Sequence, residues 1–217
     1  MNAAEKAFIM KRYSERLKLY GDSPLTLGWT KDKAQLRYHI LLNHWSFNGD
    51  ALLDFGCGFG DLYAYIKQTH LKVHYHGYDS NPDLIALGRK KYPDIPLLVA
   101  DIFTLNTPQL FDYAVSSGVH NLKLQDNWHF IEKTFEQFAR LCRKGFSLNF
   151  ISNKVTRFDA HLYHADPAKI LDLAYRYSKK IILRNDYMPF EFTIIVDLQD
   201  TFDQATVVYP EYLSYTQ

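Results

Sequence analysis

Residues Asp54–Gly60 read DFGCGFG, and no other part of the chain says as much about its architecture. The apolar residues 51–53 precede this stretch, and Leu62, Tyr63 and Ile66 follow it at helical spacing. The pattern predicts a buried strand, a tight turn and the start of a helix. Glycines at alternate positions allow positive φ and place no Cβ between the main chain and a ligand. Because the free amide groups of a helix N-terminus suit carboxylate or phosphate groups, a nucleotide-like ligand is expected here.

The glycine spacing distinguishes between two kinds of nucleotide-binding protein. The dinucleotide fingerprint GxGxxG needs its third glycine one place later, where this chain has Asp61, so a nicotinamide oxidoreductase is disfavoured. The stretch resembles motif I of the class I S-adenosylmethionine-dependent methyltransferases, in which an acidic residue precedes three glycines at alternate positions. Asp54, Gly56, Gly58 and Gly60 match all four fixed positions. The resemblance implies S-adenosylmethionine as the cofactor.

Predicted strands and helices alternate after residue 50. Apolar runs predict strands at 51–55, 73–79, 96–100, 112–117, 145–151, 180–183 and 192–196. Apolar periodicity predicts helices at 3–20, 34–45, 61–69, 82–91, 127–143 and 168–178. Strands that alternate with helices imply right-handed crossovers and a parallel sheet covered on both faces.

The end of the chain resembles the same family, whose last strand inserts antiparallel. The short link Asp186–Pro189 would join the last two strands as an antiparallel pair. We therefore predict an α/β fold, a Rossmann-like three-layer sandwich with a mostly parallel seven-stranded sheet and an antiparallel last strand. Residues 1–217 are expected to form a single methyltransferase domain, with an N-terminal helical cap at 1–48 and a Rossmann-like core at 49–217.

Ligands of open parallel sheets bind beyond the carboxyl ends of the strands, and acidic residues stand at two of these ends. The family residue that matches Asp79 accepts hydrogen bonds from ribose hydroxyls, and the one that matches Asp101 commonly meets the adenine amino group. A solvated loop carboxylate or a helix cap is the alternative for each. The residues expected to bind the cofactor are Asp54, Gly56, Cys57, Gly58, Gly60, Asp79, Ser80, Asp101, Ile102, Ser117 and Gly118.

The end of the fourth strand is where members of this family expose the reacting centre. It contains neither the Asn/Asp-Pro-Pro-Tyr/Phe sequence of many N-methyltransferases nor the Pro-Cys nucleophile of cytosine-C5 enzymes. His120, which follows this strand, and His164 are candidate catalytic bases that would take a proton as the methyl group moves. A metal site formed by His161, His164 and Asp166 is disfavoured because their spacing matches no specific metal signature. Histidines that only cap or hydrogen-bond a loop remain an alternative.

Candidate substrate-binding residues gather mainly in the N-terminal segment, which is rich in aromatic and cationic side chains. They are Tyr13, Arg16, Trp29, Arg37, Asn121 and Arg184. Tyrosine and tryptophan at helical spacing are more often packing residues, and Arg184 also fits an ordinary turn. If Arg37 binds a ligand, Arg37→Ala should weaken binding without unfolding the protein.

The composition is that of an ordinary globular domain. The 217 residues are 47% hydrophobic and 23% charged, and the net charge is +1. Such a balance offers no broad basic field, so nucleic acid is not an expected partner. The two cysteines do not form a Cys-x-x-Cys pattern and are expected to be reduced. The N-terminus has no long apolar run, so neither a signal peptide nor a membrane span is expected, and a cytoplasmic location follows.

These observations favour a methyltransferase that transfers the methyl group of S-adenosylmethionine to an oxygen or nitrogen of a small-molecule acceptor. Protein or RNA acceptors remain open. A noncatalytic S-adenosylmethionine-binding or partner-binding module is the alternative from another class. The identity of the acceptor and the oligomeric state are not predicted.

Overall fold

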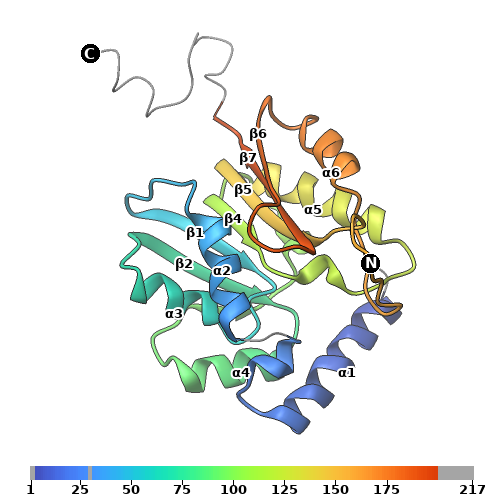
Figure 1. The fold of residues 1–217 in the computed structure, drawn as a ribbon. Coiled ribbons are helices and arrows are strands. Elements are labelled where there is room, and N and C mark those ends of the chain that lie inside the picture. The colour runs from blue at the N-terminus through green and yellow to red at the C-terminus, as the bar shows by residue number, and fades with distance from the viewer. Residues whose placement is uncertain (1–2, 29–30, 200–217) are drawn as a thin grey trace.

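The central feature is a seven-stranded sheet in the order β3-β2-β1-β4-β5-β7-β6, seen in a computed structural model that describes residues 3–28 and 31–199 (Figure 1). All neighbouring strands are parallel except β7, which is antiparallel to both β5 and β6. The strands are β1 Asp50–Phe55, β2 Val73–Asp79, β3 Leu97–Val99, β4 Phe111–Ser116, β5 Cys142–Ile151, β6 Lys180–Arg184 and β7 Glu191–Asp197. The predicted Rossmann-like sheet with an antiparallel last strand is confirmed.

Helices cover both faces of the sheet, as the alternating pattern predicts. One face packs against α2 Lys31–Leu42, α3 Asp61–Gln68 and α4 Pro82–Lys91, and their apolar side chains share a core with inward-facing residues of β1 and β4. The other face packs against α5 Asn127–Leu141 and α6 Pro167–Ala174 in a second core rich in phenylalanine. Both cysteines are buried and free. Within the described residues, no helix is both long and apolar enough to cross a membrane.

Short polar side chains fix where three of these helices begin. Asn81 accepts hydrogen bonds from the first-turn amides of α4, Asp126 caps α5 and Asp166 caps α6. Proline at the first turn of α4 and α6 adds a favourable backbone angle and has no amide to satisfy. These local signals explain why the predicted starts of α4, α5 and α6 lie within a residue of the observed ones, whereas α2 begins three residues before its predicted start.

The first helix, α1 Ala3–Tyr20, lies outside the three layers and crosses the carboxyl edge of the sheet beside α4 (Figure 1). The side-chain amide of Asn81 donates to the Met10 carbonyl at 3.1 Å, and the Ser14 hydroxyl donates to the Asp83 carboxylate at 2.6 Å. Arg16 donates to the carbonyl of Thr26 in the 3-10 helix η1 Pro24–Leu27 at 3.0 Å. Polar contacts therefore hold α1 over the strand ends, whereas α2 belongs to the layer that covers the sheet.

A buried ion pair joins α2 to the first residue of β7. The Arg37 guanidinium donates to both carboxylate oxygens of Glu191, with Nε at 2.9 and 2.7 Å, and Nη2 makes a further close contact. Each residue is only 2% exposed. A carboxylate in such a place needs its cation, because removing one partner of a buried pair leaves an uncompensated charge. Arg37 is therefore a structural residue. We no longer expect Arg37→Ala to leave folding intact; we expect it to destabilise the protein.

We predict that Arg37→Ala lowers the free energy of unfolding by about 3–5 kcal/mol, because the buried Glu191 carboxylate loses its guanidinium. Urea denaturation followed by circular dichroism measures this change. The double variant Arg37→Met/Glu191→Met, which removes both charges and keeps the volume, should remain within about 1–2 kcal/mol of the parent protein. An Arg37→Ala protein as stable as the parent would contradict the structural role of the pair.

Candidate active site

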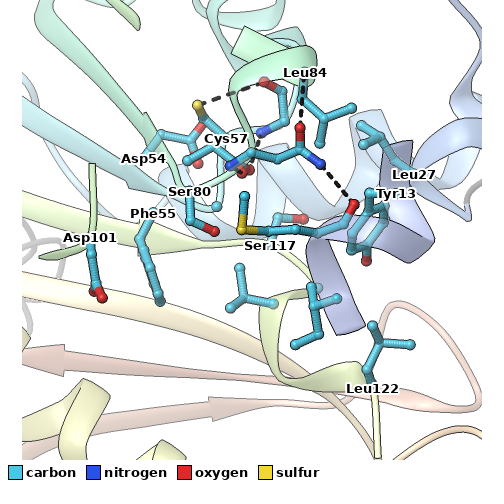
Figure 2. Close-up of a pocket in the computed structure, with 18 of the residues that line it drawn as sticks. Tyr13, Leu27, Asp54, Phe55, Cys57, Ser80, Leu84, Asp101, Ser117 and Leu122 are labelled. Atoms are coloured by element: carbon cyan, nitrogen blue, oxygen red, sulfur yellow. Dashed lines mark hydrogen bonds between the residues drawn. The ribbon is translucent and has the colours of Figure 1, made fainter. Parts of the chain in front are cut away.

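A pocket opens at the carboxyl ends of β1, β2 and β4, beneath α1 and part of α2 (Figure 2). It contains about 1170 Å³ of space, including the part open to solvent. Figure 2 shows Asp101 and Phe55 at one end of the pocket, and Tyr13 and Leu122 at the other. The site thus lies where ligands of open parallel sheets are expected.

The glycine turn forms part of the pocket wall. Gly56 and Gly58 line the pocket, with φ of +72° and +56°. A Cβ on Gly56 would lie 2.2 Å from a methyl group of Val119, so a side chain has no room there. Gly60 has φ +81° but faces Ile95 instead, 2.2 Å from where its Cβ would be. The first two glycines bring the main chain to the pocket, and the third lets the loop pack against the protein.

Asp79, at the end of β2, binds the glycine turn directly. One carboxylate oxygen accepts from the backbone amide of Gly58 at 3.0 Å, and the other accepts from the backbone amide of Asn81 at 2.8 Å. Burial raises the pKa of Asp79, although these backbone hydrogen bonds oppose the shift. Asp79 and its neighbour Ser80 both line the pocket. Since each carboxylate oxygen has more than one lone pair, Asp79 keeps acceptor capacity for a ligand hydroxyl.

Asp101 stands at the end of the pocket formed by β3 and caps the 3-10 helix η2 Ile102–Thr104. One of its oxygens accepts from the Phe103 amide at 3.0 Å, and the other contacts the Lys6 ammonium of α1. Ile102 is fully buried and belongs to the phenylalanine-rich core, not to the pocket wall. A side chain of α1 therefore covers the acidic group that the sequence singled out.

Asp54 lies at the bottom of the pocket beside Cys57 and is 3% exposed. Its carboxylate accepts a hydrogen bond from the Tyr75 hydroxyl at 2.7 Å. Burial raises the pKa of Asp54 to about 7, an effect that the hydrogen bond from Tyr75 only partly offsets. A cation in the pocket would favour the ionised form of this group.

His120 is buried behind the pocket, not exposed within it. It is 1% exposed, its ring lies between Phe130 and Phe150, and it does not line the pocket. The Thr134 hydroxyl donates to the Phe130 carbonyl, so it accepts from His120 Nε2 at 3.1 Å. This fixes the proton on Nε2. Burial lowers the pKa of His120 to about 3, which keeps the ring neutral.

The structure does not bring the other candidate catalytic and metal-binding side chains into the pocket. His164 lies in the segment between β5 and α6 and contacts Phe158, with 4.7 Å between ring centroids. Asp166 caps α6. Within the described part of the chain, no three histidine, cysteine or acidic side chains are grouped so that they could hold a metal ion.

The candidate substrate-binding residues do not all line the pocket. Tyr13 and Arg37 line the pocket, Arg37 while it is paired with Glu191. Arg16 binds the carbonyls of η1, and Arg184 pairs with Asp186 in the turn after β6, so neither lines the pocket. Asn121 ends the 3-10 helix η3 Val119–Asn121, which begins with the pocket residue Val119, but Asn121 does not itself line the pocket. It is 5% exposed, and within the described residues its side-chain amide has no hydrogen-bond partner. Trp29 lies outside the described residues.

The acidic and glycine residues of the pocket were found from the sequence, together with Cys57, Ser80, Ser117 and Gly118. Several apolar residues that line it were not: Ile9, Met10, Phe55, Phe103, Leu122 and Phe130. Ile9 and Met10 precede Tyr13 by four and three residues, so helical spacing on α1 carried a usable signal. The three phenylalanines gave none, because core and pocket aromatic residues look alike in a sequence.

Comparison with known proteins finds methyltransferases among the relatives of this chain. A family model described as a methyltransferase domain matches residues 52–145. The Mycobacterium tuberculosis protein Rv1506c, whose name assigns it provisionally as a methyltransferase, is 33% identical over 151 residues, which cover 66% of this chain and 90% of that protein.

Solved structures share the fold at low sequence identity. Magnesium protoporphyrin IX methyltransferase from Synechocystis PCC 6803 with bound S-adenosylmethionine has a TM-score of 0.63 at 14% identity, over 91% of this chain and 99% of that one. The 1,6-didemethyltoxoflavin-N1-methyltransferase of Burkholderia thailandensis has a TM-score of 0.59 at 15% identity, over 91% and 90%. With the glycine motif, the strand order and the relative in M. tuberculosis, these similarities show that the chain belongs to the class I S-adenosylmethionine-dependent methyltransferase family.

Proposed function

We propose that the protein transfers the methyl group of S-adenosylmethionine to an oxygen or nitrogen atom of a small-molecule acceptor. The observation that carries this proposal is the cover that α1 forms over the pocket, from Lys6 at one end to Tyr13 at the other. A compact acceptor fits beneath such a cover more readily than a folded protein or an RNA. The net charge of +1 also offers no broad field for a polyanion.

The pocket has suitable groups for each part of the cofactor. The glycine turn at Gly56 and Gly58 leaves main chain open to a ligand, Asp79 would accept from ribose hydroxyls, and Asp101 would meet the adenine. When bound, S-adenosylmethionine supplies a methyl group that its positively charged sulfonium already activates. Asp54 and Ser117 line the remaining wall, where the buried carboxylate would face the cationic part of the cofactor.

Catalysis would then depend mainly on alignment and the exclusion of water. His120 is neutral and buried behind Phe130, and His164 lies elsewhere, so neither histidine stands ready as a base. The acceptor would therefore bring its own reactive lone pair, as an amine, a carboxylate or an acidic hydroxyl does. Asn121, whose buried side-chain amide has no partner in the described chain, follows the pocket residue Val119 in η3 and does not line the pocket, so we assign it no contact with the acceptor.

The names of the similar structures support a small acceptor. One is named for magnesium protoporphyrin IX, and the other contains its small-molecule substrate together with S-adenosylhomocysteine. Their identity to this chain is 14–15%, so the support that they give comes through the shared fold.

We predict that the affinity for S-adenosylmethionine falls about tenfold between pH 8 and pH 6. Asp54, with a pKa of about 7, is mostly ionised at the higher pH and mostly protonated at the lower, and only the ionised form attracts the cationic cofactor. Calorimetry at both pH values in buffers of different ionisation enthalpy would also detect the proton released on binding. Asp54→Asn should bind with little change over this range, and a parent protein whose affinity does not depend on pH would contradict the role of Asp54.

The proposed function is tested by measuring cofactor binding and turnover on the same samples. Calorimetry with S-adenosylmethionine should show micromolar binding by the parent, weakened about 10–100-fold in Asp79→Asn because a charged acceptor is lost. Asp94→Asn, an exposed carboxylate outside the pocket, is the matched control. Formation of S-adenosylhomocysteine is then followed with a panel of small amines, phenols and carboxylic acids.

Transfer to a panel member, reduced in Asp79→Asn and not in Asp94→Asn, would support the proposal. Binding without transfer to any small molecule, protein or RNA would favour a noncatalytic binding module. A parent protein that does not bind the cofactor would refute the proposal altogether.

A further inference from the structure

A second, smaller groove adjoins the candidate active site. Its lining residues are Phe8, Arg12, Leu122, Lys123, Ala160 and His161, and Leu122 also lines the main pocket. The groove and the pocket therefore share a wall. Three of its six lining side chains are basic and none is acidic.

Backbone hydrogen bonds hold two sides of this groove together. The Lys123 amide donates to the His161 carbonyl at 3.1 Å, and the Tyr163 amide donates to the Asn121 carbonyl at 3.0 Å. Leu122 and Leu162 form an isolated antiparallel bridge between these contacts. The segment after η3 is thus hydrogen-bonded to the segment between β5 and α6. These bonds bring Lys123 and His161 together in the lining of the groove.

The third side comes from α1. Phe8 and Arg12 are four residues apart and so lie on one face of the helix. Ile9 and Tyr13, one position further on, line the main pocket. Glu5 lies one turn earlier, where its carboxylate accepts from the Gln125 amide at 2.7 Å, and it does not line the groove. One helix therefore covers the proposed methyl-transfer site and also supplies an aromatic and a cationic side chain to the adjoining groove.

We propose that the methyl acceptor carries an anionic group, a carboxylate or a phosphate, which binds to Arg12, Lys123 and His161. Its reactive atom would extend past Leu122 into the main pocket. This inference rests on the proposed function and deepens it by naming the chemical class of the acceptor. An arginine fork binds a planar carboxylate or a phosphate in two places, and the aromatic ring of Phe8, 60% exposed, offers an apolar surface for the body of the molecule.

The chemistry of the main pocket is consistent with this division of roles. The pocket holds the acidic groups Asp54, Asp79 and Asp101, which would repel an anion, so a negative group of the acceptor is best placed outside it. The two cations of the pocket wall already contact carboxylates, Lys6 with Asp101 and Arg37 with Glu191, whereas no carboxylate lines the groove.

The test uses two fluorescent probes of similar shape, anionic 1-anilinonaphthalene-8-sulfonate and neutral N-phenyl-1-naphthylamine. Each is titrated into the protein saturated with S-adenosylhomocysteine, so that the proposed cofactor site is occupied. We expect the anionic probe to bind at least about tenfold more tightly, a difference of about 1.4 kcal/mol. Equal affinities for the two probes would overturn the proposal.

The double variant Arg12→Gln/Lys123→Gln should bind the anionic probe at least about tenfold more weakly than the parent protein. Its affinity for the neutral probe should change less than about twofold. The matched control is Lys11→Gln, whose side chain is on the same helix, is 76% exposed and does not line the groove. A specific site would be refuted if Lys11→Gln weakened binding of the anionic probe as much as the double variant does. It would also be refuted if neither variant weakened that binding.

Competition identifies the anion. Benzoate or phenyl phosphate should displace the anionic probe at concentrations at least about tenfold lower than benzamide does. Stronger displacement by benzoate would indicate a carboxylate on the acceptor, and stronger displacement by phenyl phosphate would indicate a phosphate. Displacement by benzamide at the same concentrations would overturn the proposal. Calorimetry with S-adenosylhomocysteine on the same samples separates the two claims: absence of binding refutes the proposed function and this inference with it, whereas normal binding with charge-independent probe affinities refutes the inference alone.

Discussion

The contact between the Asp79 carboxylate and the Gly58 amide connects the end of β2 to the glycine turn after β1. The turn is held from the same strand by a second contact, because the Gly56 amide donates to the Tyr78 carbonyl at 2.8 Å. With positive φ at Gly56 and Gly58, these bonds fix a main-chain wall before any ligand arrives. Asp79 thus shapes the pocket as well as lining it, and the rest of the site is arranged around this junction.

The junction also determines where α1 can lie. The Asn81 side chain, two residues beyond the end of β2 at Asp79, donates to the Met10 carbonyl and caps α4. At one end of α1, Lys6 contacts Asp101. The cover over the pocket is therefore attached through the same strand ends that would bind the cofactor. Cofactor binding and the position of the cover should be coupled, because Asp101 serves both Lys6 and the proposed adenine site.

Sequence reasoning succeeded where a local pattern carries the structure. The glycine motif, the strand ends and the helix caps are set by residues close together in the chain. It could not place residues whose role depends on distant partners. Arg37 and Glu191 are 154 positions apart in the sequence, and no local pattern around either residue indicates that they form an ion pair. His120 is removed from the pocket by packing between Phe130 and Phe150, and Ile102 by burial in the core.

The proposed cofactor site is tested most directly by a crystal structure of the protein with S-adenosylhomocysteine at saturating concentration. We expect electron density beneath α1, against the main chain of Gly56 and Gly58. The ribose hydroxyls should lie within hydrogen-bond distance of Asp79, and the adenine ring should lie beside Asp101. An empty pocket at saturation, or density for the ligand at another place on the protein, would contradict the assignment of this pocket as the cofactor site.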